Sequence, residues 1–389
     1  MSSYRWELLN ADEDVPFQEV SIDCRSVPGC PGEWSVRTRT LSGGKREGVQ
    51  VVEVDTGAAR WWLLPTRGLN VWRGWSGDGE LGWRSPVRGP VHPAFVPLYD
   101  PSGLGWLEGF DELLVRCGLE SNGAPDFDAD GRLKYPLHGR IGNTPAHTLH
   151  AEVDSEKRRL RIIAEMDEVR FHFQKLRLVA AFETEIGSTG FTLHDRLVNL
   201  SESPAEAQLL YHPNFGAPLL DAGAQLVVPA KTVVPRNARA AEGVATWSHY
   251  AAPQAGFEEQ VYFFELYADR RHWTTVLLKN AHGTEGVRLD FDVRRLPCFT
   301  QWKNTTALSD GYVTGIEPGT NFPNPRSFET AQGRVVRLDP RGAAEFVLKL
   351  KWLRSPGAVS DAERRVRAIR GDRPTTVHRT PQPGWCVDA

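Results

Sequence analysis

The sequence predicts an all-β protein, a large antiparallel β-sandwich with only a few short helices. Many short runs between residues 150 and 352 alternate apolar and polar side chains, which is the pattern of half-buried strands. Turn-forming residues separate these runs, and no helical pattern is interleaved with them. Parallel sheets need such crossover helices, so the pattern favours antiparallel strands. A sandwich of this size can occupy 389 residues as one unit.

The strands are expected at regular intervals along the chain. The clearest is the last, where Phe346, Leu348, Leu350 and Trp352 point one way and the intervening residues point the other. The expected strands include residues 51–55, 60–65, 159–165, 169–173, 176–182, 190–199, 207–211, 260–267, 273–279, 287–291 and 346–352, and a further strand is expected to end at Tyr312-Val313 and Ile316.

The segments outside these strands are less regular. Residues 1–46 are turn-rich and predict an N-terminal arm with short strands, ahead of a main domain at 47–352. Within that domain, residues 76–146 are rich in Gly and Pro, with one short amphipathic helix expected at 106–114. A further helix of one to three turns is expected near 361–370 in the C-terminal tail, 353–389, which either packs on the surface or is disordered.

Composition excludes several classes of function. A formal net charge of -3 provides no basic surface for nucleic acid. The chain begins without a basic and apolar leader and contains no apolar run of about 18 residues, so we expect a cytoplasmic protein without membrane contact. Five scattered cysteines without a CxxC motif indicate reduced thiols and no zinc site. Nucleotide-binding motifs are also absent, so no cofactor is expected.

One acidic motif could suggest a calcium loop. Asp126, Asp128 and Asp130 copy the opening of such a loop, but its twelfth position is Leu137 where a bidentate Glu is required. A polar surface turn is the favoured interpretation of the Asp126–Asp130 stretch.

Three residues are candidates for acid–base chemistry. Glu317 follows an apolar run and precedes Pro318-Gly319, so we expect it where a strand gives way to a loop, as a catalytic base or as a solvated loop residue. His138 and His212 also sit at expected element ends, and Pro213 is expected to stop the strand at His212. The alternative for each histidine is a structural hydrogen bond across a loop.

Five more residues are candidate ligand contacts. Asn214, followed closely by Gly216, would let the backbone approach a ligand. Arg67, Arg116, Gln301 and Lys303 lie near expected element ends, where they could donate to hydroxyls or to an anionic substituent. The alternative for the charged ones is a surface ion pair or a side chain extending to solvent.

Four motifs, in order, resemble the galactose mutarotase (aldose 1-epimerase) superfamily: LHGRIGN, DRLVNLSESP leading to LLYHPNFG, CFTQWKN and GIEPGTNFP. The closer resemblance, over about residues 47–352, is to a branch of unknown function known only as aldose 1-epimerase family proteins. It implies a β-supersandwich that binds a monosaccharide or sugar derivative on one face, without metal or nucleotide. It also implies that His212 protonates the ring oxygen, His138 assists and Glu317 deprotonates the anomeric hydroxyl.

The chain departs from the superfamily pattern at residues that would contact the sugar. The Asn-Arg pair expected ahead of the first histidine has only Arg116 and Asn122 as counterparts, and the substrate-binding aspartate corresponds to Asp290 or Asp292. Opposite charges across a cleft are expected to favour an ionised Glu317. Two alternatives are a sugar-binding or sensor protein on the same fold, and an epimerase for a ketose or a sugar acid. In the sugar-acid enzyme, Lys303 with Arg67 or Arg116 would bind the anion.

Overall fold

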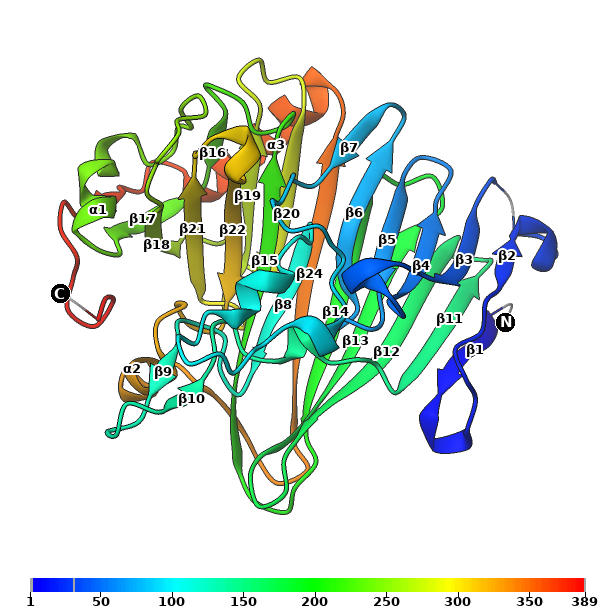
Figure 1. The fold of residues 1–389 in the computed structure, drawn as a ribbon. Helices are drawn as coiled ribbons and strands as arrows, with labels where there is room; N and C mark the ends of the chain where they lie inside the picture. Colours follow the sequence, from blue (N-terminus) through cyan, green and yellow to red (C-terminus); the bar gives the residue numbers. More distant parts are fainter. Residues whose placement is uncertain (1–2, 31, 388–389) are drawn as a thin grey trace.

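The computed structural model describes residues 3–30 and 32–387, which form two large sheets (Figure 1). The first sheet has nine strands in the order β1-β11-β12-β13-β14-β24-β20-β19-β16. Their bounds, in that order, are Ser3–Asn10, Thr148–Asp154, Arg159–Val169, Lys175–Glu185, Gly190–Asn199, Ala343–Leu353, Gly286–Asp292, Trp273–Lys279 and Gln225–Val227.

The second sheet has fourteen strands, twelve of them in the order β2-β3-β4-β5-β6-β8-β15-β22-β21-β18-β17-β25. Their bounds are Ser21–Asp23, Ser35–Thr40, Gln50–Asp55, Arg60–Leu64, Asn70–Ser76, Leu114–Leu119, Ala205–Gly216, Val313–Gly319, Cys298–Asn304, Gln260–Leu266, Ala230–Pro235 and Thr376–Val377. β7 (Gly79–Leu81) pairs with β6, and β23 (Val336–Leu338) pairs with β15. Within the described residues only β25 pairs in parallel, with β17, so the prediction of an antiparallel sandwich is confirmed.

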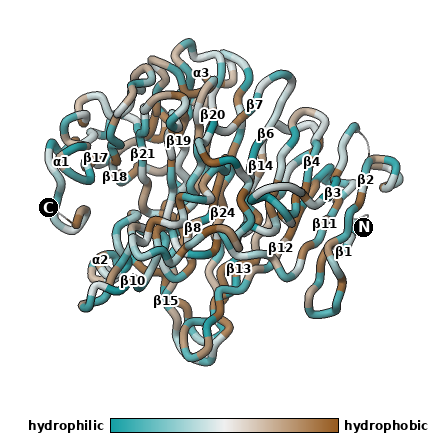
Figure 2. Tube along the Cα trace, in the orientation of Figure 1, coloured by the Kyte–Doolittle hydropathy of each residue, from teal (hydrophilic) through white to brown (hydrophobic). Residues whose placement is uncertain are grey.

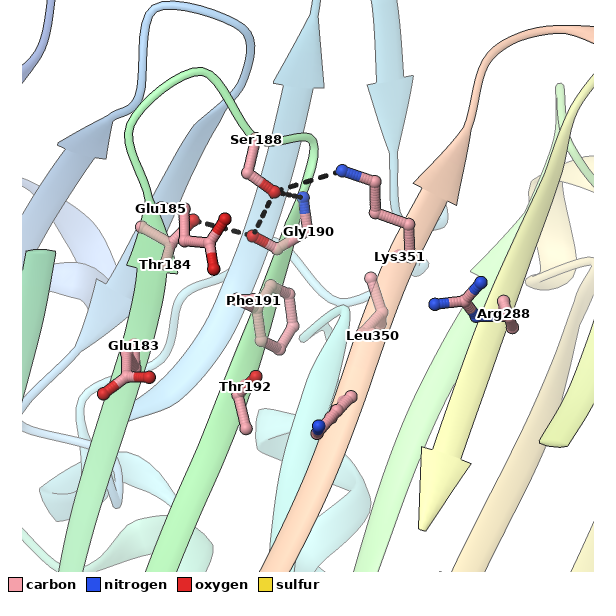
Figure 3. Close-up of a pocket in the computed structure, with 11 residues that line it drawn as sticks. Glu183, Thr184, Glu185, Ser188, Gly190, Phe191, Thr192, Arg288, Leu350 and Lys351 are labelled. Atoms are coloured by element: carbon pink, nitrogen blue, oxygen red, sulfur yellow. Dashed lines mark hydrogen bonds between the residues drawn. The ribbon is translucent and has the colours of Figure 1, made fainter. Parts of the chain in front are cut away.

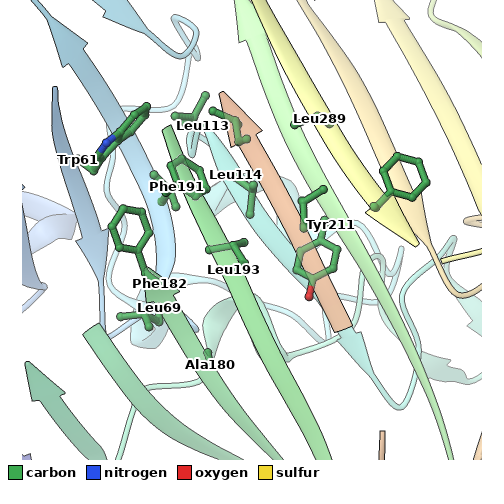
Figure 4. Close-up of a cluster of buried hydrophobic side chains, with 14 of the residues drawn as sticks. Trp61, Leu69, Leu113, Leu114, Ala180, Phe182, Phe191, Leu193, Tyr211 and Leu289 are labelled. Atoms are coloured by element: carbon green, nitrogen blue, oxygen red, sulfur yellow. The ribbon is translucent and has the colours of Figure 1, made fainter. Parts of the chain in front are cut away.

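The main hydrophobic core lies between the two sheets (Figure 4). Trp61 of β5 meets Phe191 of β14 edge to face at 4.9 Å between ring centroids, which joins one sheet to the other. Hydrophobic and hydrophilic residues alternate along strands such as β12 and β13 (Figure 2). This alternation gives each strand one face for the core and one for the opposite side.

The ends of the chain extend both sheets. β1 pairs with β11 in the first sheet, whereas β2 and β3 extend the second. After β24, helix α3 (Pro356–Arg370) packs its apolar side on β19, and β25 then joins the edge of the second sheet. Near the C-terminus Trp385 stacks on Phe322 at 5.0 Å and its carbonyl accepts from Asn324 Nδ2, so the tail lies against the loop that follows β22.

Four local predictions were wrong. Glu317 does not lie where a strand gives way to a loop, because β22 continues through Glu317 to Gly319. Residues 170–174 form the hairpin turn between β12 and β13, so the expected strand at 169–173 retains only its first residue. The expected helix at 106–114 is a short 3-10 helix, Gly105–Gly109, followed by β8. Pro213 does not end β15, because a proline removes only its own N–H and Asn214 continues the pairing with Gly315.

The remaining helices are short and lie in connections. They are α1 (Ala238–Glu242) and α2 (Arg326–Ala331), and a two-stranded sheet of β9 (Asp126–Phe127) and β10 (Leu133–Tyr135) lies nearby in the irregular region. In the described part of the chain no helix is both long and apolar enough to cross a membrane.

Two carboxylates of the calcium-like motif accept hydrogen bonds from nearby protein groups. Asp126 accepts hydrogen bonds from the Ser327 amide and hydroxyl, and Asp128 accepts from the amides of Asp130 and Arg132. Among the described residues no cluster of three His, Cys, Asp or Glu is arranged to hold a metal ion.

Candidate active site

Three polar side chains lie side by side across the middle of the second sheet. The register of β15 with β22 places His212 opposite Glu317, because Leu210 pairs with Gly319 and Asn214 pairs with Gly315. Glu317 in turn pairs with Thr300 of β21. This row of three, His212-Glu317-Thr300, belongs to the sheet face that does not pack on the nine-stranded sheet, since the next residue, Tyr211, points to Asp195 of β14.

The irregular segments before and after β8 lie over one face of the second sheet (Figure 1), and their residues help to line a cavity at this row. The cavity has a volume of about 370 Å³, a size typical of small-molecule sites. Aromatic walls surround His212: the ring centroids of Phe110 and Trp302 lie 5.4 and 5.7 Å from its centroid, and Trp106 lies 6.4 Å away. The polar residues that line the cavity are His138, His212, Arg236, Glu259, Thr300 and Glu317.

Glu317 and His212 face each other at close range. His212 Nε2 lies 3.3 Å from Glu317 Oε1, and the two side chains are only 5% and 2% exposed. Glu317 Oε1 makes no hydrogen bond to any other described residue. A buried carboxylate oxygen without a donor is costly in an empty cavity, so it is available to bind a ligand hydroxyl.

Asn214 determines which nitrogen of His212 carries a proton. Asn214 Nδ2 donates to the carbonyls of Glu112 and His212, at 3.0 and 2.9 Å. Its Oδ1 must therefore accept from His212 Nδ1 at 2.7 Å, so Nδ1 is protonated. His212 Nε2 is left facing Glu317, and these two atoms can hold one proton between them.

Burial affects which of the two side chains, Glu317 or His212, holds that proton. Desolvation raises the pKa of Glu317 well above its ordinary value, and desolvation, with His138 nearby, lowers the pKa of His212 well below its own. Both directions favour a protonated carboxyl beside a neutral imidazole. These directions are opposite to the expectation of an ionised Glu317 beside a charged histidine.

His138 lies next to the pair in the loop after β10. Its ring meets that of His212 edge to face at 5.2 Å, and its Nδ1 donates to the Asn122 carbonyl at 2.9 Å. Burial lowers the pKa of His138 to about 4, so its Nε2 is an unprotonated acceptor at neutral pH. The backbone of His138 is left-handed, with φ of 57°, a conformation uncommon for non-glycine residues and concentrated at functional sites.

The mouth of the cavity carries an ion pair that the sequence did not reveal. Arg236, directly after β17, donates to Glu259 at 2.8 Å, and the other oxygen of Glu259 accepts from Trp302 Nε1 at 2.6 Å. Glu259 thus fixes the orientation of the Trp302 ring. No motif marks Arg236 or Glu259, and only the pairing of β17 with β18 brings them together.

Two predicted ligand contacts are buried structural residues. Arg67 donates to Glu112 at 2.8 Å and to Asn143 Oδ1 and the Val91 carbonyl, each at 2.7 Å. Arg116 forms a bidentate pair with Asp195 at 2.6 and 3.0 Å. Neither arginine lines the cavity, and each is committed to protein acceptors, so both assignments were wrong.

Gln301 and Lys303 point to the face of β21 that is turned away from the cavity. Gln301 Nε2 bonds the Trp247 carbonyl and Tyr250 hydroxyl, and Lys303 Nζ bonds the His249 carbonyl at 2.7 Å. The cavity is lined instead by their neighbours Thr300 and Trp302, one residue away in the alternation.

The other predicted contacts have positioning or unrelated roles. Asn214 orients His212 without lining the cavity, and the Asn122 carbonyl holds His138. Asp290 and Asp292 are on the nine-stranded sheet, where they pair with Arg288 and Arg294, so the suggestion of a substrate-binding aspartate there was wrong.

A second hollow lies on the outer face of the nine-stranded sheet (Figure 3). Some of its polar groups bond each other: Lys351 Nζ donates to Ser188 Oγ at 3.1 Å, and Thr184 donates to the Gly190 carbonyl at 2.7 Å. It therefore lacks the unsatisfied, closely facing acid and base that distinguish the cavity at Glu317.

Comparison with known proteins identifies the family and the fold of the chain. The family model for a domain of unknown function, DUF4432, matches residues 46–352. A solved structure from Klebsiella pneumoniae, whose name is "putative aldose 1-epimerase", is 37% identical, with a TM-score of 0.94, over 97% of this chain and 99% of its own. No curated protein matches the chain.

More distant structures share the fold alone. A galactose mutarotase-like protein from Clostridium acetobutylicum is 15% identical, with a TM-score of 0.57, over 82% of this chain and 99% of its own. A galactose 1-epimerase from Lactobacillus acidophilus is 12% identical, with a TM-score of 0.54, over 83% of this chain and 100% of its own. The chain belongs to the DUF4432 family and has the fold of the galactose mutarotases, as its motifs indicated.

Proposed function

We propose that the protein is a mutarotase, an enzyme that interconverts the α and β anomers of a free monosaccharide or sugar derivative. The observation that carries this proposal is the contact of His212 Nε2 with Glu317 Oε1 in a closed cavity. Anomer exchange requires one group that removes the proton of the anomeric hydroxyl and one that protonates the ring oxygen. A pair holding one proton provides both functions.

In the proposed reaction the sugar enters, and its hydroxyls form hydrogen bonds with Glu317 and His212. These bonds stabilise the charged forms of both side chains, so the shared proton moves to His212 Nε2. Glu317 then takes the proton of the anomeric hydroxyl while His212 gives its proton to the ring oxygen. The bond between C1 and the ring oxygen breaks, and an open-chain aldehyde forms. Rotation about C1–C2 and the reverse proton transfers close the ring on the other face, and the pair regains its starting state.

The assisting roles follow from the hydrogen bonds. Asn214 holds Nδ1–H of His212, so Nε2 is always the nitrogen that faces the reaction. His138 presents an unprotonated Nε2 and therefore accepts from a sugar hydroxyl rather than donating a proton to it. Each positioned acid or base of this kind contributes about 10²–10⁴-fold to a rate.

The activity can be measured by two-dimensional NMR exchange spectroscopy on a panel of free aldoses, ketoses and uronates. We expect the protein to accelerate anomer exchange of at least one sugar above the rate in buffer. A protein that binds a sugar, detected by calorimetry, without accelerating its exchange would instead be a sugar-binding or sensor protein. Neither binding nor exchange across the panel would contradict both functions.

Gly315 leaves the space in which Glu317 and His212 meet. A Cβ at this position would collide with Glu317 Oε1 and lie 3.0 Å from His212 Cε1. We expect Gly315→Ala to displace the pair and lower kcat for anomer exchange by about 10–100-fold, because small displacements of reacting groups are costly. Circular dichroism should show an intact fold.

The matched control is Gly357→Ala in α3, where nothing lies within 4 Å of an added Cβ. This variant should leave the exchange rate unchanged. Full activity in Gly315→Ala would mean that the close contact of the pair is not needed.

A further inference from the structure

We propose that the preferred substrate is an uncharged deoxy sugar, which lacks at least one hydroxyl away from its anomeric carbon. This inference rests on the proposed mutarotase function and concerns the same cavity. It follows from where the cavity has polar groups and where it has none.

The polar groups of the cavity floor are concentrated in one short row. Thr300 Oγ1 is buried, lines the cavity and has no hydrogen-bond partner among the described residues, and Glu317 Oε1 has only His212 Nε2 beside it. Both atoms therefore await a ligand hydroxyl. Beyond the row of three, the neighbouring strands continue it with Val115 on one side and Phe263 on the other, so the polar floor ends there.

The walls are largely aliphatic. A sugar site commonly has an aromatic side chain against one apolar sugar face, which Trp106, Phe110 or Trp302 provides here. The remaining apolar lining is different, because aliphatic side chains and prolines neither stack on a sugar nor donate hydrogen bonds. It consists of Leu104, Leu107, Ala124, Pro125, Leu137, Val261 and Pro323. Leu104 and Leu107 remain 45% and 44% exposed, so this apolar wall continues outward to solvent.

The charges at the cavity mouth cancel. Arg236 is the only cation among the lining residues, and Glu259 already neutralises it at 2.8 Å. The carboxylate of a sugar acid would have to compete with Glu259 and would lie in the same cavity as Glu317. The cations that could have bound an anion, Arg67, Arg116 and Lys303, are all outside the cavity. The site therefore favours a neutral ligand.

A hydroxyl forced against the aliphatic wall loses its hydrogen bonds to water without replacement. A methyl or methylene group at the same position loses nothing and gains apolar contact. Apolar pockets reject an added hydroxyl only modestly, so we expect a selectivity of about 10–100-fold in kcat/KM.

The test compares sugars that differ by one oxygen, with the full-length protein and NMR exchange spectroscopy. The pairs are D-fucose with D-galactose, 6-deoxy-D-glucose with D-glucose, and L-rhamnose with L-mannose, and D-glucuronate and D-galacturonate are the charged members. We expect at least one deoxy sugar to exceed its parent about 10–100-fold in kcat/KM, and the uronates to be poorer than either.

The outcomes separate the two proposals. If exchange is accelerated but every parent hexose equals or exceeds its deoxy partner, or a uronate is best, the deoxy-sugar inference is wrong and the mutarotase function stands. If no sugar of any class exchanges faster, the mutarotase proposal itself fails.

A wall variant gives a second test. Val261→Thr adds one hydroxyl to the cavity with almost no change of shape, and Val227→Thr, on β16 of the other sheet, is its matched control. We expect Val261→Thr to reduce the preference for the deoxy sugar, whereas Val227→Thr keeps it. An unchanged preference in Val261→Thr would show that this wall does not select the substrate.

Discussion

Replacing Glu317 with Gln should lower the anomer exchange rate by about 10²–10⁴-fold, because the amide keeps the shape of the side chain but cannot take a proton. The same variant should be at least as stable as the wild type at pH 8. Exchange spectroscopy and thermal unfolding measure the two effects. Glu80→Gln, at an exposed carboxylate of β7, serves as the control and should change neither.

The pH dependence of that stability difference has a definite sign. Burial raises the pKa of Glu317 in the folded protein, so the folded state holds a proton that the unfolded state has released above about pH 4.5. This contribution of Glu317 to the stability of the wild type is therefore lost as the pH rises from that value, and the Gln variant lacks it. The melting temperature of the variant minus that of the wild type should grow between pH 4.5 and pH 8. A variant that loses activity and is also destabilised at pH 8 would indicate a structural role.

Replacing Arg116 with Met should lower the free energy of unfolding by about 3–5 kcal/mol, the usual cost of leaving a buried charge without its partner. Arg116 and Asp195 are both fully buried between the two sheets, and Tyr211 also donates to Asp195, at 2.9 Å. The double variant Arg116→Met, Asp195→Asn should recover part of the loss, because no buried charge is then left unpaired. Urea unfolding provides the measurement.

Arg364→Met is the control for that experiment. Arg364 pairs with Asp361 on the exposed side of α3, where both side chains are more than two-thirds exposed, so the variant should change stability by less than about 1 kcal/mol. If Arg116→Met left stability unchanged and raised KM for the sugar, the original assignment of Arg116 as a ligand contact would be correct after all.

The fold was predictable because its signal is local and repeated. Strand alternation such as that of residues 346–352 identifies both a strand and its buried face without knowledge of the partner strands. The errors occurred where the same local signal is ambiguous. Phe171 and Phe173 are apolar but exposed in a hairpin turn, and the spacing of Trp106 and Phe110 fits a helix although the chain turns into β8 after one short 3-10 turn.

The site was only partly predictable, because a strand residue one position away faces the opposite layer. Gln301 and Lys303 have the chemistry of sugar ligands, yet alternation sends them away from the cavity and brings Thr300 and Trp302 into it. The pairing of Thr300 with Glu317 determines which residues of β21 lie on the same sheet face as Glu317. That pairing is a property of the sheet and cannot be obtained from either strand alone.

The sequence contains even less information about residues whose roles depend on partners far away along the chain. Arg236 and Glu259 are 23 positions apart and belong to no motif, and they meet only because β17 and β18 are neighbours. Similarly, the role of Asn214 depends on a carbonyl of Glu112, 102 positions away. Glu317 and His212 could be named as candidates from their motifs, whereas the groups that orient them required the tertiary structure.

The C-terminal tail has a consequence for how the cavity could change over evolution. Pro323 forms part of the cavity wall, and its neighbours Phe322 and Asn324 are held by Trp385, which lies 33 residues beyond the matched family domain at 46–352. The wall is therefore supported by a segment that lies outside the residues that the family model matches. Substitutions or changes of length in this tail should change the wall at Pro323 while leaving Glu317 and His212 in place.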